Sequence, residues 1–183
     1  MAHTQYDKIA FPESVNELTV QQYQKFLKVD DTNQTFQLLK ACEIFLGIPL
    51  KKAMTYQSDQ FFTMMAELLE MIGQKQKLEP IVEYNGKEYG FIPSLEELTL
   101  GEYVDLDEYL SDMEYLHKTV AVLYRPITQR IGYKYTIEPY EPNDGYKDFP
   151  LGVALGALVF FYDLSKELSG IIQTSLEIQM PKE

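Results

Sequence analysis

Cysteine and histidine are scarce in this sequence of 183 residues, which contains one cysteine, Cys42, and two histidines, His3 and His117. A single cysteine excludes an intrachain disulfide, and the apolar neighbourhood LLKACEIFLGIP predicts that the Cys42 thiol is buried. The sequence has no His-x-x-His, no His-Glu-x-x-His and no paired cysteines, so it offers no ligand set for zinc. We therefore predict neither a metal site nor a cofactor, and we place His117 on a helix surface or at the edge of the core.

Sequence patterns of nucleophilic and phosphate-handling enzymes are also missing. No Gly-x-Ser-x-Gly elbow is present, and Cys42 has no positioned base beside it. Gly152 and Gly156 enclose an apolar stretch with no Lys-Ser or Lys-Thr after it, which excludes a phosphate-binding loop. Asp105 and Asp107 lie two residues apart, and on a helix such side chains point in different directions. This acidic run therefore predicts a solvated helical face, and we predict no catalytic residue and no enzyme activity.

Long hydrophobic runs are absent as well. The most apolar run, LGVALGALVFFY at 151–162, has 12 residues, whereas a membrane-spanning helix needs about 20. We expect instead a buried helix whose two glycines permit close packing. The first residues, MAHTQYDKIAFPE, lack the basic start and apolar stretch of a signal peptide, which favours the cytoplasm.

Positive charge is in deficit, with a net charge of −12 and a pI of about 4.6. A field of this sign repels phosphate backbones and anionic lipid, so we predict neither a nucleic-acid nor a membrane partner. It favours basic protein partners. Mimicry of DNA by an acidic surface, to block a host enzyme, is a minor alternative.

What the sequence does contain is a pair of similar stretches, NELTVQQYQKF at 16–26 and EELTLGEYVDL at 96–106. Each has the form of a capping box, in which a threonine and a Gln or Glu three positions later satisfy free amides at a helix start. These boxes are Thr19 with Gln22 and Thr99 with Glu102. The similarity allows two interpretations, a true duplication at a spacing of 80 residues or shared capping chemistry.

Further local signals complete the predicted organisation. A helix over 33–46 ends at Gly47, and Ser58 caps the next helix, which runs to Gly73. Asn85-Gly86, between IVEY and KEYGFI, predicts a two-residue β-hairpin turn. A later helix ends at Pro126. YKYTIEPYEP follows as a strand or extended segment, and a last helix spans about 150–168.

This order predicts a mainly α, α+β fold: a helical bundle in two halves separated by a small β-hairpin, with one additional extended segment. The expected divisions are an N-terminal arm at 1–15, a first helical half at 16–78, the hairpin at 79–93 and a second helical half at 94–183. We expect them to form one compact unit.

Aromatic residues gather near the hairpin and the extended segment. Tyrosine gives a large contact area at low entropic cost and is enriched in protein interfaces. The candidate protein-binding residues are these aromatics together with one arginine: Tyr84, Tyr89, Phe91, Tyr124, Arg125, Tyr133, Tyr135 and Tyr140. A purely structural role, in which the aromatics close the edge between hairpin and helices, is an equal alternative.

The order of these segments resembles a family of tailed-bacteriophage proteins, the tail assembly chaperones. The resemblance rests on YGFIPSLEELTLGEYVDLDEYL followed by LHKTVAVLYRPIT. ELTVQQYQKFLKV, ACEIFLGIPLKKAM, YTIEPYE and PLGVALGALVFFYDLSKEL agree with it in order, so that it covers about residues 16–168. These motifs are structural and carry no catalytic role.

The resemblance implies a non-enzymatic morphogenesis protein that acts in the host cytoplasm during phage assembly. Such a protein would bind the long helical tape-measure protein, keep it soluble and help to recruit tail-tube subunits, and it could form a homo-oligomer. The alternative is a structural virion component, such as a neck, baseplate or capsid-internal protein, which would remain in the mature particle.

Overall fold

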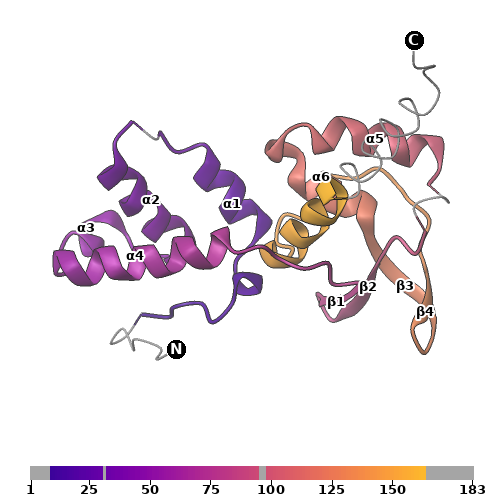
Figure 1. Cartoon of the computed structure of the whole chain (residues 1–183), viewed down its shortest axis with the longest axis horizontal. Helices are drawn as coiled ribbons and strands as arrows, with labels where there is room; N and C mark the ends of the chain where they lie inside the picture. The colour runs from indigo at the N-terminus through magenta and orange to yellow at the C-terminus, as the bar shows by residue number, and fades with distance from the viewer. Residues whose placement is uncertain (1–8, 31, 95–97, 164–183) are drawn as a thin grey trace, which may run out of the picture.

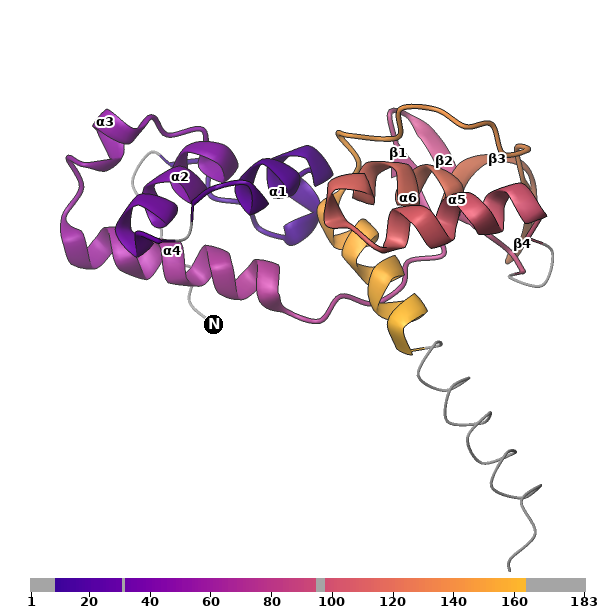
Figure 2. The ribbon, with the colours of Figure 1, turned by 90° about the horizontal axis from the view of Figure 1, so that it is seen from above.

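The chain has a mixed α+β fold, shown in the computed structural model of Figures 1 and 2, which describes residues 9–30, 32–94 and 98–163. Four helices form its first part: α1 (Val20–Leu27), α2 (Gln34–Leu46), α3 (Leu50–Ala53) and α4 (Ser58–Gly73). The second part combines a four-stranded sheet with α5 (Leu100–Leu110) and α6 (Leu116–Leu123). Short 3-10 turns, η1 (Val15–Glu17) and η3 (Met113–Tyr115), precede α1 and α6.

Both predicted capping boxes are confirmed. Thr19 Oγ1 accepts a hydrogen bond from the Gln22 amide at 3.2 Å, and the Thr19 amide donates to Gln22 Oε1 at 2.8 Å. Thr99 and Glu102 form the same reciprocal pair at the start of α5. These bonds satisfy two amides that the first helical turn would leave free.

Of two further predicted helix boundaries, the end at Gly47 is confirmed and the cap at Ser58 is wrong. Gly47 ends α2 in a left-handed conformation with φ of 65°, as expected for a C-terminal glycine. The predicted Ser58 cap is wrong, because Ser58 is already the first residue of α4 and Gln57 precedes it without a side-chain cap.

The Cys42 thiol is fully buried, as predicted, and burial raises its pKa to about 11.

The four strands form one antiparallel sheet in the order β1-β2-β3-β4, made of Ile81–Tyr84, Lys87–Phe91, Tyr124–Ile131 and Lys134–Ile137. The Asn85-Gly86 turn is confirmed, with φ of 51° and 72°. The predicted hairpin is therefore one half of a larger sheet.

The prediction that Pro126 ends a helix is wrong. The helix α6 ends at Leu123, and Pro126 lies inside β3 opposite Tyr89. The predicted extended segment is confirmed in part, since it contains β4.

A helix over residues 151–163 packs against both parts of the chain (Figure 2). Its first amide, that of Leu151, donates to the Leu18 carbonyl at 2.8 Å, and the Val20 amide donates to Phe149. Phe149, Leu151 and Leu18 are buried in a core that α4, α6 and the sheet share. Within the described ranges, no helix has the length and apolar character that a membrane span requires.

Close packing at the two glycines of this helix is confirmed. A Cβ built on Gly156 would lie 2.3 Å from the Lys77 carbonyl oxygen, and one on Gly152 would lie 2.3 Å from Asn16 Oδ1. Gly156 thus lets the helix lie directly against the backbone of the connection between α4 and β1.

Gly156→Ala is expected to lower the free energy of unfolding by about 1–3 kcal/mol. The new methyl group would clash with a backbone carbonyl oxygen, which cannot move aside as the end of a flexible side chain can. Gly101→Ala is the matched control, since Gly101 lies in α5 with no atom within 4 Å of an added Cβ. That control is expected to stabilise by about 0.5–1 kcal/mol through helix propensity. Urea unfolding of both variants measures the two effects. Equal stabilities would contradict the packing assigned to Gly156.

Candidate protein-interaction surface

Most of the aromatic residues predicted to bind a partner lie in one cluster beneath the sheet. Tyr89, Phe91 and Tyr124 are buried, and Tyr84 is partly buried beside them. The cluster is centred on Phe149, whose ring centroid lies 5.0 Å from that of Tyr84 and 5.4 Å from that of Tyr124. This placement fits the structural alternative for these four residues.

Tyr135 and Tyr140 use their hydroxyl groups to join elements. The Tyr135 hydroxyl donates to the Phe91 carbonyl at 2.7 Å, and the Tyr140 hydroxyl donates to Asp105 Oδ2 at 2.6 Å. Burial raises the pKa of Tyr140, and the neighbouring Asp105 carboxylate raises it further. Both tyrosines are therefore fixed by internal bonds.

Arg125, the one cation of the predicted set, is nearly buried, with an exposed fraction of 9%. Its Nη1 lies 2.7 Å from Glu102 Oε1, and the other carboxylate oxygen of Glu102 accepts from the Thr99 amide and hydroxyl. Its Nε has no hydrogen-bond partner within the described part of the chain. The capping glutamate of α5 thus also holds the start of β3.

The pH dependence of stability is expected to report this carboxylate. Burial alone would raise the pKa of Glu102, but the Thr99 hydrogen bonds and the Arg125 charge outweigh it, so the pKa lies below its ordinary value. A lowered folded-state pKa means that Glu102 stabilises the protein above the ordinary glutamate pKa and loses this contribution as the pH falls through the lowered value. Urea unfolding across this acidic range should show the stability difference between wild type and Glu102→Gln shrinking on acidification. A constant difference would contradict the assignment.

Tyr133 differs from the rest of the predicted set, because 98% of it is exposed. It lies with the exposed Ile131 at the turn between β3 and β4, where Gly132 has φ of 62°. The eight predicted residues therefore do not form one surface. Tyr133 alone among them is fully open to a partner, and its role in binding remains a prediction.

A larger exposed apolar area, missed from the sequence, lies on α5 and η3. Leu100, Tyr103 and Val104 are exposed by 79%, 59% and 53%, and their helical spacing places them on one face. The opposite face of α5 is buried through Glu102 and Leu106. The exposed set continues through Leu110 and Met113, and we call these five apolar residues (Leu100, Tyr103, Val104, Leu110 and Met113) the α5 surface.

An apolar groove of about 480 Å³ adjoins the α5 surface at the C-terminal end of α5. Leu110 and Met113 lie at this groove, and Leu116 contributes to its lining from α6. Leu158 and Phe161 contribute from the helix over 151–163. Apolar residues on an open helix face and in an adjoining groove are typical of sites that bind another protein.

The chain segment that carries the α5 surface has charged residues of one sign only. Residues 98–116 contain no lysine, arginine or histidine, and they contain six carboxylates, which are Glu102, Asp105, Asp107, Glu108, Asp112 and Glu114. The solvated acidic face predicted for this run is confirmed in part: Asp107, Glu108, Asp112 and Glu114 are exposed, whereas Asp105 is partly buried and accepts from Tyr140. An apolar patch with this border favours a partner that carries positive charge beside an apolar stripe.

No three His, Cys, Asp or Glu side chains converge as metal ligands would in the part of the chain that the structure describes. His117 is half-buried at the start of α6.

Comparison with known proteins gives no match to any family model, to any curated protein or to any solved structure.

Proposed function

We propose that this protein is a non-enzymatic bacteriophage assembly protein, a tail assembly chaperone whose α5 surface binds an apolar helical segment of the tape-measure protein. The observation that carries the proposal is the exposed apolar face of α5, which continues into the apolar groove within a purely acidic segment. The segment GFIPSLEELTLGEYVDLDEYL, on which the resemblance to this family largely rests, includes the whole of α5.

The protein would cover the apolar stripe of the tape-measure helix and add negative charge to the complex. An amphipathic helix can lay its apolar stripe on an apolar groove and is read through side chains at i, i+3, i+4 and i+7. A complex with this chain would then hide the stripe from other copies and gain a net charge of −12. Both effects keep an aggregation-prone helical protein in solution until the tail tube grows around it.

We also infer that the two helical parts act as one unit during assembly. Support comes from the helix over 151–163, which contacts Leu18 in the first part and the backbone of Lys77 before the sheet. The β1-β2 hairpin would then separate two helical halves that share this helix.

Co-expression with the neighbouring tail genes, followed by affinity capture of this chain, tests the proposal. The tape-measure protein, the tail-tube protein or both should be retained at a defined stoichiometry. Capture of neither would contradict the proposal. Mass spectrometry of purified virions separates it from the alternative, because a chaperone is lost from mature particles whereas a neck, baseplate or capsid-internal protein is present in stoichiometric amount.

A further inference from the structure

A second hollow, distinct from the α5 surface, lies between α1 and the stretch from η3 to α6. Its volume is about 320 Å³, and its lining includes Lys25, Lys28, Lys118, Lys147, Gln24 and His117. We call it the lysine pocket. Four of the 16 lysine and arginine residues of a strongly acidic chain therefore face one small space.

Among the residues that the structure describes, three of these four lysines have no counter-charge within ion-pair distance. Lys28 pairs with Glu114. Lys25 donates to the neutral Gln21 side chain, and Lys118 lies 5.3 Å from the centre of the Tyr109 ring. Within the described residues, neither these two ammonium groups nor that of Lys147 lies within ion-pair distance of a carboxylate. Like charges repel when gathered in this way, so an anion is the natural occupant.

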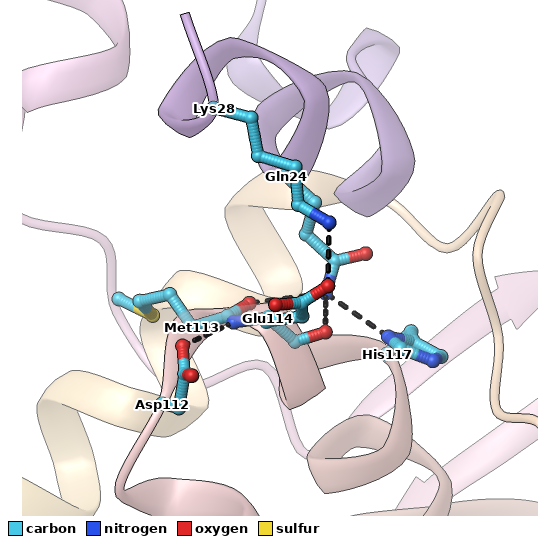
Figure 3. A network of polar contacts seen from close by, with 6 residues as sticks. All are labelled: Gln24, Lys28, Asp112, Met113, Glu114 and His117. Atoms are coloured by element: carbon cyan, nitrogen blue, oxygen red, sulfur yellow. Dashed lines mark hydrogen bonds and ion pairs between the residues drawn. The ribbon is translucent and has the colours of Figure 1, made fainter.

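The walls of the lysine pocket are held together by hydrogen bonds, which Figure 3 shows around Gln24. Gln24 Nε2 donates to the carbonyl oxygens of Met113 at 3.0 Å and Glu114 at 2.7 Å, joining α1 to η3. The backbone amide of Gln21 donates to the Lys147 carbonyl at 2.8 Å, which joins α1 to the segment before Phe149. The lysines therefore project from a fixed frame.

His117 lies beside the same bonds. The Gln24 side-chain nitrogen that donates to these two carbonyl oxygens also lies 3.0 Å from Nδ1 of His117. Burial lowers the pKa of His117, and the charges of Lys147 and Lys118 lower it further. A lowered pKa disfavours the charged imidazole, so the positive charge of the lysine pocket comes from its lysines.

We propose that the lysine pocket binds the carboxylate side chains of an acidic segment in a protein partner. Glu114 supports a carboxylate as the ligand, because it already occupies one edge of the lysine pocket as the partner of Lys28. The lining contains no arginine and no glycine. It therefore lacks the planar guanidinium fork and the glycine-rich loop that are typical of phosphate sites.

Binding of a fluorescein-labelled octaglutamate peptide to the full chain, followed by fluorescence polarisation at low and physiological salt, tests this proposal. Wild type should bind saturably and more weakly as salt rises. The triple variant K25Q/K118Q/K147Q should bind about tenfold more weakly or worse, from the loss of three ion pairs. The control K51Q/K52Q/K134Q makes the same change in net charge at exposed sites elsewhere and should bind as wild type does. No binding to wild type, or equal losses in both variants, would overturn the proposal.

Glu114→Gln provides a test of opposite sign. Removing the internal carboxylate frees Lys28, so the octaglutamate peptide should bind more tightly, by about threefold. Weaker binding would contradict the competition between Glu114 and the peptide for Lys28.

Displacement of the peptide by millimolar inorganic phosphate would make phosphate the ligand. Self-association of wild type that the K25Q/K118Q/K147Q triple abolishes would make a second copy the occupant. Either result would overturn the proposal that the lysine pocket binds an acidic segment of a protein partner.

Discussion

Arg125→Met is expected to lower the free energy of unfolding by about 3–5 kcal/mol, since it leaves a buried carboxylate without its counter-charge. Glu102 has an exposed fraction of 4% and lies at the junction of α5 with β3. Its bonds to Thr99 would remain, but they compensate only part of the cost of burying the charge. Urea unfolding measures the loss.

Arg130→Met is the matched control for this prediction. Arg130 pairs with Glu88, and both side chains are largely exposed, so its replacement should cost less than about 1 kcal/mol. The double variant Glu102→Gln with Arg125→Met should recover part of the loss, because it removes both buried charges. A double variant that loses as much as the two single variants together would contradict the account of this ion pair.

The triple variant L100S/Y103S/V104S is expected to weaken binding to the captured tail partner by about a hundredfold or more. Large apolar side chains at the centre of an interface commonly contribute about 2 kcal/mol or more each, although such losses do not add. All three residues are exposed, so their replacement should leave the melting temperature nearly unchanged. Titration calorimetry of the purified pair measures the change.

The double variant I131S/Y133S is the control for the α5 surface. It removes exposed apolar area of comparable character at the turn between β3 and β4. Binding should survive this change. If the control lost affinity and the L100S/Y103S/V104S triple kept it, the partner would bind at Tyr133, the one open residue of the set predicted from the sequence.

Local chemistry explains which parts of the fold were predictable. The capping boxes at Thr19 and Thr99, the Gly47 helix end and the Asn85-Gly86 turn each depend on a few neighbouring residues. The β3 strand was missed because the apolar stretch VAVLY belongs to α6 apart from its last residue, and Pro126, which usually ends a helix, lies here inside the strand that follows. Its pairing with β2 joins residues about 35 apart and leaves no local signal.

The two similar stretches share their caps and differ in what the caps hold. Gln22, in the first, donates to the Ile44 carbonyl in α2. Glu102, in the second, binds Arg125 at the start of β3. A neutral amide suits a backbone carbonyl and a carboxylate suits a guanidinium, so the difference between Gln22 and Glu102 matches the neighbour of each helix.

The candidate site was less predictable because residue type does not report burial. Tyr89 and Tyr124 have the composition of an interface yet lie in the core. A usable signal was present in α5, where Leu100, Tyr103 and Val104 lie opposite Leu106. The fold buries the face with Leu106 and leaves the apolar face with Leu100, Tyr103 and Val104 exposed.

Hydroxyl-radical footprinting of the captured complex tests most directly whether the α5 surface is the binding site. In the free chain Tyr103, Met113 and Tyr133 are all exposed, so each should be oxidised. In the complex the account predicts protection of Tyr103 and Met113, with Tyr133 oxidised as before. Protection of Tyr133 with no change at Tyr103 and Met113 would contradict it.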